Sequence, residues 1–396
     1  MAHRQIPSRQ IFTVKAFTFF VYGVMSIFYS FFPLYLRNSG LDNVQIGLLM
    51  AFGPLVSVFA NPFWGYWSDR LQNVKRTMLI LLTGSFCIFE ALFLNDSFLF
   101  LLIGLVLYFF FQNSILSQNS TLILQSIEGT IYQFGSFRLW GSLGWALVSV
   151  AVSPALELAG IGNMWAVYAG VMLVAIAFAS ALPAAPSESE TRMTWSDFRT
   201  LFFNRPFYLF LLLTVFVSIP NSMHGTFGTL YISELGGSSV AIGWSSFFTA
   251  IFEIPVFLLL DRYLRNDRRI MMLCLSLITV LYSVRWLLLS FAAGPVYVIL
   301  LQAMHSITFG GYYYIGTSLT AQLVPARFRA SGQAAYAMAW GGLSGVIAGT
   351  AGGWIFETWG ARIMYQTGAW MAIVCTAGFL LLWRFGSGRR SGSVDV

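Results

Sequence analysis

Three ionisable side chains in the second half of the sequence lie inside long apolar segments: Glu253, Arg285 and His305. Ionisable residues are costly within a bilayer and usually mark an ion or proton pathway. Burial favours the neutral form of a carboxylic acid, whereas an approaching arginine favours the carboxylate. We therefore predict that Glu253 carries a proton and that Arg285 and His305 modulate its uptake and release. The structural alternatives are a permanent Glu253–Arg285 ion pair and a neutral, hydrogen-bonded core histidine.

A second group of side chains is suited to binding a small polar solute. Gln118 and Asn119 stand in an apolar segment, where amides facing lipid would be costly. Arg138 offers a rigid fork of hydrogen-bond donors, and Trp145 follows it about two helical turns later. The alternatives are hydrogen bonding between helices for the amides, topological charge bias for Arg138 and packing for Trp145. Residues at spacings or depths that could face the same cavity complete the candidate substrate site: Tyr22, Asn221, His224, Tyr336 and Trp340.

The composition places all these residues in a membrane. Of 396 residues, 57% are hydrophobic and only 9% are charged, and the mean hydropathy is +0.73. Soluble domains carry about 25% charged residues. The 22 basic and 15 acidic residues are too few for a water-soluble surface of this size, despite a net charge of +7. The composition thus excludes a soluble enzyme, a disordered protein and a nucleic-acid-binding domain.

Apolar segments of the length needed to cross a bilayer, about 20 residues each, predict twelve transmembrane helices. The polar segment 183–206 separates six of them from the other six. The predicted organisation is a six-helix bundle over 1–182, a cytoplasmic linker over 183–206 and a second six-helix bundle with a short tail over 207–396. The predicted spans are 12–36, 44–66, 77–94, 98–122, 137–158, 164–182, 207–232, 240–260, 270–291, 295–322, 333–356 and 363–384.

Short patterns recur between the two halves at nearly constant offsets. Tyr35 followed by Ile46-Gly47 recurs as Tyr231 followed by Ile242-Gly243, at an offset of 196 residues. Two further patterns recur at offsets of 192 and 191: Asp69-Arg70 as Asp261-Arg262, and Arg138-x-x-Gly141 as Arg329-x-x-Gly332. Matches in register with the span count predict two pseudo-symmetric six-helix repeats, and hence an all-α polytopic membrane protein.

The basic residues predict the orientation of the chain in the membrane. With a cytoplasmic N-terminus, the outer loops hold only Arg37 and Arg362, and Arg285 lies within a span. The other 19 of the 22 basic residues then lie on the inner side, as the positive-inside rule requires. We expect a multi-pass protein of a bacterial cytoplasmic membrane with both termini inside. Because no small-residue cleavage site follows the first apolar segment, that segment is predicted to be a helix rather than a removed signal peptide.

The loop after the second span carries a recognisable motif. Gly65-Tyr-Trp-Ser-Asp69-Arg70, followed by Asn73 and Lys75-Arg76, resembles the G-x-x-x-D-R-x-G-R-[RK] signature of the major facilitator superfamily, with Asn73 where a second glycine is usual. The resemblance implies that this family's twelve-helix fold is present and that the loop stabilises a gate between the halves. The implied gate residues, extended through the repeat, are Gly65, Asp69, Arg70, Arg76, Asp261 and Arg262.

The segment from Phe134 to Trp145 resembles the start of the fifth span in the lactose permease branch of that superfamily. This resemblance implies that Arg138 forms hydrogen bonds to the substrate and that Trp145 stacks on it. That branch also has an acid, an arginine and a histidine on spans eight to ten, but Thr308 stands here in place of its proton-carrying acid, and the fourth span is polar without a charge. The stretch from His305 to Gln333 resembles nucleoside and phenylpropionate symporters instead.

These features together predict proton-coupled uptake of a sugar, nucleoside or aromatic acid by alternating access. The alternatives are a proton-coupled antiporter that exports drugs or metabolites, and a non-transporting membrane receptor or scaffold. An enzyme is not expected, because the sequence shows no metal-ligand cluster, nucleophile–base pair or phosphate-binding loop. The expected partners are a small-molecule substrate, protons and the lipid bilayer, with no nucleic acid, cofactor or metal, and the protein is expected to function as a monomer.

Overall fold

The computed structural model describes residues 7–71, 73–182, 204–264, 267–325 and 329–385, and the regular elements in these ranges are helices. Here the N-terminal half means the helices before residue 183 and the C-terminal half those after residue 203. The predicted linker over 183–206 lies largely outside the described residues. The helices of the N-terminal half are α1 (Ser8–Asn38), α2 (Asn43–Leu71), α3 (Val74–Ala91), η1 (Leu92–Leu94), α4 (Phe98–Gln112), α5 (Ile115–Ile127), α6 (Phe134–Ala159), η2 (Ile161–Asn163) and α7 (Met164–Ser180).

The C-terminal half repeats this order of long helices, with more interruptions. Its elements are α9 (Arg205–Glu234), α10 (Ser239–Ile251), α11 (Glu253–Tyr263), α12 (Arg268–Ser290), α13 (Pro295–His305), η3 (Ser306–Gly310), α14 (Gly311–Leu323), α15 (Arg329–Ala337), η5 (Met338–Leu343) and α16 (Ser344–Phe385). Within α16 the chain turns sharply at Gly360, whose φ of 79° is accessible to glycine at little steric cost. Two spans therefore share this label.

All twelve predicted spans correspond to helices. By length and composition, ten helical runs among the described residues are suited to crossing a membrane. The last of these runs, Ser331–Arg384, contains two spans because of the turn at Gly360, and the remaining span, 295–323, is divided by η3. Four spans that hydropathy predicts as continuous are interrupted in the structure. The fourth breaks between α4 and α5, the eighth at Phe252, and the tenth and eleventh at the π-helical segments η3 and η5.

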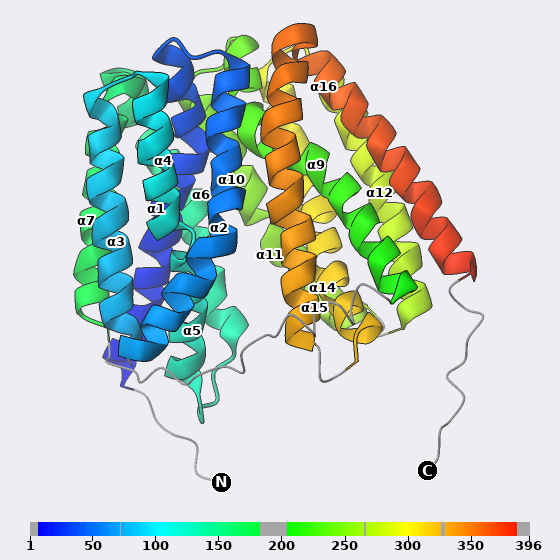
Figure 1. Ribbon diagram of the computed structural model, residues 1–396, viewed down its shortest axis with the longest axis horizontal. Coiled ribbons are helices and arrows are strands. Elements are labelled where there is room, and N and C mark those ends of the chain that lie inside the picture. The colour runs from blue at the N-terminus through cyan, green and yellow to red at the C-terminus, as the bar shows by residue number, and fades with distance from the viewer. Residues whose placement is uncertain (1–6, 72, 183–203, 265–266, 326–328, 386–396) are drawn as a thin grey trace.

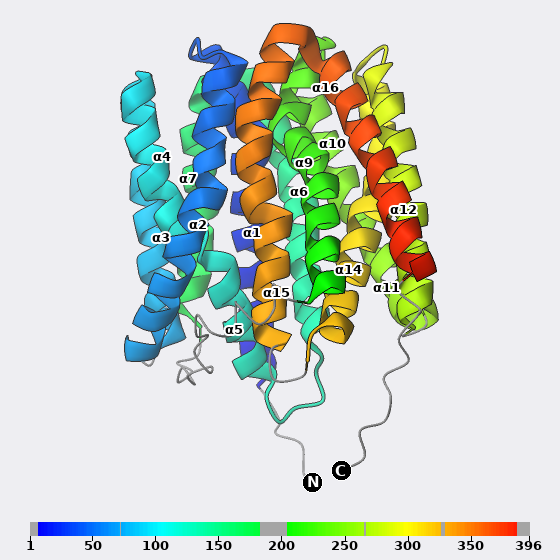
Figure 2. The ribbon, with the colours of Figure 1, turned by 45° about the vertical axis from the view of Figure 1, so that its right-hand side comes forward.

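The helices stand side by side in one bundle (Figures 1 and 2), with the N-terminal half mainly on the left and the C-terminal half mainly on the right in Figure 1. Within the halves, α1 packs on α6 and α7, and α16 packs on α9 and α12. The main helix pairs that join the halves are α2 with α16, α6 with α10, and α1 with α9. In the predicted repeat, the second span corresponds to the eighth and the fifth to the eleventh. The α2–α16 contact therefore corresponds to the α10–α6 contact.

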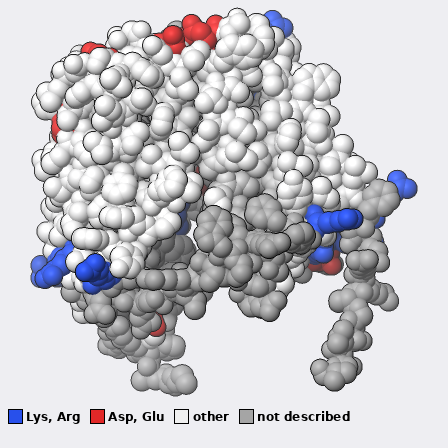
Figure 3. Space-filling model, in the orientation of Figure 1, with Lys and Arg blue, Asp and Glu red and all other residues white. Residues whose placement is uncertain are grey.

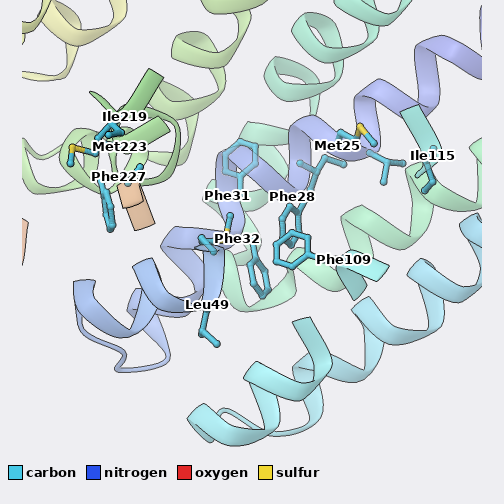
Figure 4. Close-up of a cluster of buried hydrophobic side chains, with 14 of the residues drawn as sticks. Met25, Phe28, Phe31, Phe32, Leu49, Phe109, Ile115, Ile219, Met223 and Phe227 are labelled. Carbon is cyan, nitrogen blue, oxygen red and sulfur yellow. The ribbon is translucent and has the colours of Figure 1, made fainter. Parts of the chain in front are cut away.

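Aromatic side chains fill the core of the N-terminal half. Phe28 of α1 stacks on Phe32, with ring centroids 4.9 Å apart, and meets Phe109 of α4 edge to face at 5.7 Å. Figure 4 shows this cluster, and Met223 and Phe227 of α9 lie to the left of it in the view. Large rings give helices that lie in lipid a close-packed interface without polar groups.

Charges separate toward the two ends of the bundle (Figure 3). We call the end at which α1 begins the basic end and the opposite end the acidic end. Arginines and lysines lie mainly at the basic end, whereas acids in the loops and helix ends of the opposite side give the acidic end its name: Asp42, Asp96, Glu157, Glu234 and Glu357. This separation fits the predicted orientation, in which the basic end faces the cytoplasm.

Candidate functional site

Predicted site residues from both halves lie near one another where α6 contacts α11. Glu253, the first residue of α11, lies 3.9 Å from His305 Nε2 at the end of α13. From the N-terminal half, the guanidinium of Arg138 lies 4.3 Å from the centre of the Tyr22 ring. Arg138 interacts electrostatically with both Tyr22 and Glu253. An arginine of one half thus faces an acid of the other.

These side chains are largely buried, but some of their polar atoms have no hydrogen-bond partner. The side chains of Glu253 and His305 are only 14% and 10% exposed. Among the buried polar atoms without a hydrogen-bond partner in the described residues are Nη1 of Arg138 and Nδ1 of His305, and also Oε1 of the predicted substrate residue Gln118 on α5. Buried polar atoms without partners are costly unless a water or ligand binds them. The site can therefore receive hydrogen bonds from a polar solute and donate hydrogen bonds to it.

Arg285 lies elsewhere, inside the C-terminal half. It is fully buried, donates from Nη2 to Oε1 of Gln302 at 3.1 Å and lies 4.4 Å from the Trp286 ring centre. The structure therefore places Glu253 beside His305 and within electrostatic reach of Arg138, and among the described residues it does not show the alternative, a Glu253–Arg285 ion pair. The reason is geometric, since the contacts of Arg285 face the interior of its own half.

Gln302 extends this interior network to three other helices. Its Nε2 lies 3.0 Å from Nε2 of His224 and donates to Ser245 Oγ at 3.0 Å. His224 Nδ1 lies 2.9 Å from the hydroxyl of Tyr365. His224 thus contacts the interior of the C-terminal half rather than the N-terminal half. Sequence reasoning missed Gln302, although an amide within an apolar span gives the same signal that identified Gln118.

The other predicted substrate residues fall into two groups. Trp145 lies where the halves meet, because its Nε1 donates to Ser246 of α10 at 2.9 Å. Asn119 accepts a hydrogen bond from Thr18 at 3.2 Å, and Asn221 accepts one from Tyr282 at 3.4 Å, so both bridge helices within one half.

Tyr336 and Trp340 belong to an aromatic cluster on spans ten and eleven. Trp340 stacks on Tyr312 with centroids 5.1 Å apart, and its backbone oxygen, in η5, accepts hydrogen bonds from Ser218 and Ser344. These serines satisfy a carbonyl within the π-helical segment, so the position of Trp340 is well determined. The cluster reaches the central site through Phe309, whose ring stacks on His305 at 5.0 Å and tilts toward Trp340 at 5.8 Å.

The predicted gate residues lie at the basic end. Tyr314 donates to Asp261 at 3.1 Å, and Arg262 lies over the neighbouring Tyr263 ring. Asn73, the departure from the motif, accepts from the backbone N–H of Arg76 at 3.1 Å and so forms the N-cap of α3. Gly65 and Arg70 lie on the last turns of α2, whereas the side chain of Asp69 is outside the described residues. These described contacts each stay within one half.

Polar contacts that join the halves lie at mid-height and at the acidic end. Ser30 of α1 is 2.9 Å from Ser246 of α10. Arg37 and Glu234 form an ion pair at 2.9 Å between the ends of α1 and α9. These contacts hold the two halves together at the acidic end.

A helical membrane protein built of two matching halves, with polar groups facing each other between them, has the architecture of an alternating-access transporter, as the major facilitator motif predicts. The model of the MFS_1 like family matches residues 11–367, and the chain belongs to this family.

Relatives and solved structures agree with this assignment. The chain is 28% identical to the maltose permease of Geobacillus stearothermophilus over 374 residues, which cover 92% of this chain and 93% of the permease. It is 25% identical to the lactose permease of Citrobacter freundii over 133 residues, covering 31% and 32% of the two chains. A crystal structure of the nucleoside transporter NupG superposes with a TM-score of 0.79 at 17% identity, covering 94% of this chain and 99% of that one.

Proposed function

We propose that this transporter carries a small neutral sugar into the cell together with a proton, across the cytoplasmic membrane, by alternating access. The observation that carries the proposal is that α6, which holds Arg138, contacts α11 of the other half, which begins at Glu253, beside His305 and within electrostatic reach of the arginine. The halves must move relative to one another during transport, so such a pair forms and breaks in each cycle. A change in the charge of Glu253 would therefore act directly on the movement.

The cycle follows from the charges of these groups. When the site opens at the acidic end, a proton binds to Glu253 and removes its attraction for Arg138. The guanidinium is then free to donate to substrate hydroxyls, so proton and substrate are bound together. After the halves rock and the basic end opens, the substrate leaves, the proton passes to the cytoplasm and the Arg138–Glu253 attraction returns.

The choice of a sugar rests on the site and on one relative. An arginine, uncharged amides and aromatic rings are the groups that bind hydroxyls and the apolar faces of sugar rings. One acid and one arginine leave the centre without a net charge, which suits a neutral solute. The maltose permease that resembles this chain over most of its length supports the same class.

The direct test uses purified protein in vesicles with an imposed proton gradient, acidic outside. We expect labelled maltose to accumulate only while the gradient lasts, and excess unlabelled sugar to compete where a nucleoside and an aromatic acid do not. Gradient-driven depletion of preloaded sugar would instead establish antiport. Accumulation of the nucleoside or the aromatic acid, with no uptake of any sugar, would overturn the substrate class.

Replacing Arg138 tests its contact with the substrate. Arg138→Lys keeps the charge but loses the fork of donors, and we expect the apparent affinity for the sugar in an exchange assay to fall about tenfold or more, as for loss of hydrogen bonds to a charged group. Arg9→Lys, an exposed arginine at the start of α1, is the matched control and should keep wild-type affinity. An unchanged affinity in Arg138→Lys would remove this residue from the substrate site.

A further inference from the structure

At the acidic end, two carboxylates reach from one half of the molecule to the other. Glu357, near the end of the eleventh span, accepts hydrogen bonds from the backbone N–H of Asn43 at 3.1 Å and from its side-chain amide at 2.6 Å. Glu157, near the end of α6, accepts from the backbone N–H of Ser239 at 2.6 Å. The residues that donate these hydrogen bonds are buried, with Asn43 only 5% and Ser239 only 8% exposed.

Both carboxylates bind the start of a helix. Asn43 is the first residue of α2 and Ser239 the first of α10. The first backbone N–H groups of a helix have no acceptor within that helix, and its positive dipole end attracts an anion. Each helix is also capped by the residue just before it. Asp42 accepts from the Gln45 N–H at 2.7 Å, and Ser238 accepts from the Ala241 N–H at 3.4 Å. The glutamates therefore add a second cap, supplied from across the interface.

The two contacts correspond to each other in the predicted repeat. The second span is the counterpart of the eighth, and the fifth is the counterpart of the eleventh. Glu157 of the fifth span caps the eighth, and Glu357 of the eleventh caps the second. These are also the helix pairs that pack across the interface, α6 with α10 and α16 with α2. A chance contact would not be expected to occur at both equivalent places.

We propose that Glu157 and Glu357 are paired latches that hold the acidic end closed and must release before substrate can enter from that side. They are positioning residues that act on the equilibrium between the two conformations. The gate motif places its residues at the basic end, so these latches provide the corresponding closure at the other end. The Arg37–Glu234 ion pair lies at the same level and adds a third contact between the halves.

The test measures how easily the acidic end opens. Ser30 is 5% exposed and lies on the contact between the halves, so a cysteine there becomes reactive when this end opens. The native cysteines Cys87, Cys274 and Cys375 are replaced by alanine, and Ser30→Cys is labelled in membranes with an impermeant maleimide. We expect Glu157→Gln or Glu357→Gln to raise the labelling rate about threefold each, and the double variant about tenfold, as for loss of a charged cap.

Asp96→Asn is the matched control, because Asp96 lies at the same end but accepts hydrogen bonds from Tyr35 and Ser39 of its own half. Its labelling rate should equal that of the unaltered background. Labelling in denaturant gives the total amount of Ser30→Cys protein, so poor folding is not mistaken for opening. A double variant that labels at the background rate, or a control that labels as fast as the double variant, would overturn the proposal.

Discussion

Glu253→Gln is expected to abolish accumulation of substrate against its gradient while leaving exchange of preloaded substrate intact. Glutamine resembles the protonated acid in shape and charge but does not release a proton, so the variant cycles between its two conformations only with substrate bound. For one proton per substrate, each pH unit of gradient supports about tenfold accumulation. With a gradient of two units, the ratio of inner to outer substrate should fall from about 100 toward 1 in the variant.

The pH dependence of exchange provides a second measurement on Glu253→Gln. In the wild type, exchange should slow at alkaline pH, where Glu253 loses its proton and attracts Arg138 again. In the variant it should stay constant, because no carboxylate forms. Glu90→Gln is the matched control, since Glu90 is an acid within α3 of the N-terminal half, and it should accumulate substrate normally. Proton-driven accumulation by Glu253→Gln would show that another group carries the proton.

Apolar length and charge placement were sufficient to predict the helices. The sixth span was predicted at 164–182 and α7 is Met164–Ser180; the ninth was predicted at 270–291 and α12 is Arg268–Ser290. The bilayer fixes the length of a span, and unpaired backbone groups are excluded from lipid, so these limits follow from hydropathy. The breaks within four spans were not predicted, because hydropathy stays high through them and side chains of neighbouring helices satisfy the freed backbone groups. At the break in the fourth span, for example, Trp64 Nε1 of α2 donates to the backbone oxygen of Phe110, in the last turn of α4, at 2.9 Å.

The partners of the central charges could not be predicted in the same way. The sequence identified Glu253, Arg285 and His305 as unusual, and the structure brings the first and third together. Which arginine faces Glu253 depends on how the two halves pack, and Arg138 is more than a hundred residues away in the chain. The sequence also did not predict that Glu157 and Glu357 each cap a helix of the other half, for the same reason. An acid at a helix end gives no sign in the sequence that it binds a helix of the other half.

Substitution of the glycines that face each other across α2 and α16 should have a large effect on the closed acidic end. A Cβ at Gly47 would overlap the backbone oxygen of Gly349, and a Cβ at Gly349 would overlap the oxygen of Gly47 and lie 2.8 Å from Ala51 Cβ. These atoms are backbone or next to backbone, so the clash is relieved only if the helices separate. Gly47→Val and Gly349→Val should therefore shift the protein toward the state open at the acidic end.

Overpacking of a close contact costs about 1–3 kcal/mol, which corresponds to a shift of roughly 5- to 150-fold in the equilibrium between the closed and open states. We expect uptake to be lost, substrate binding from the acidic end to be kept, and labelling of Ser30→Cys to rise further than in the glutamate variants. Gly170→Val is the matched control, because a Cβ at Gly170 of α7 has no neighbouring atom within 4 Å. Full uptake by Gly47→Val would mean that the acidic end need not close this tightly during transport. Greater labelling without loss of uptake would mean that closure at this end does not limit the cycle.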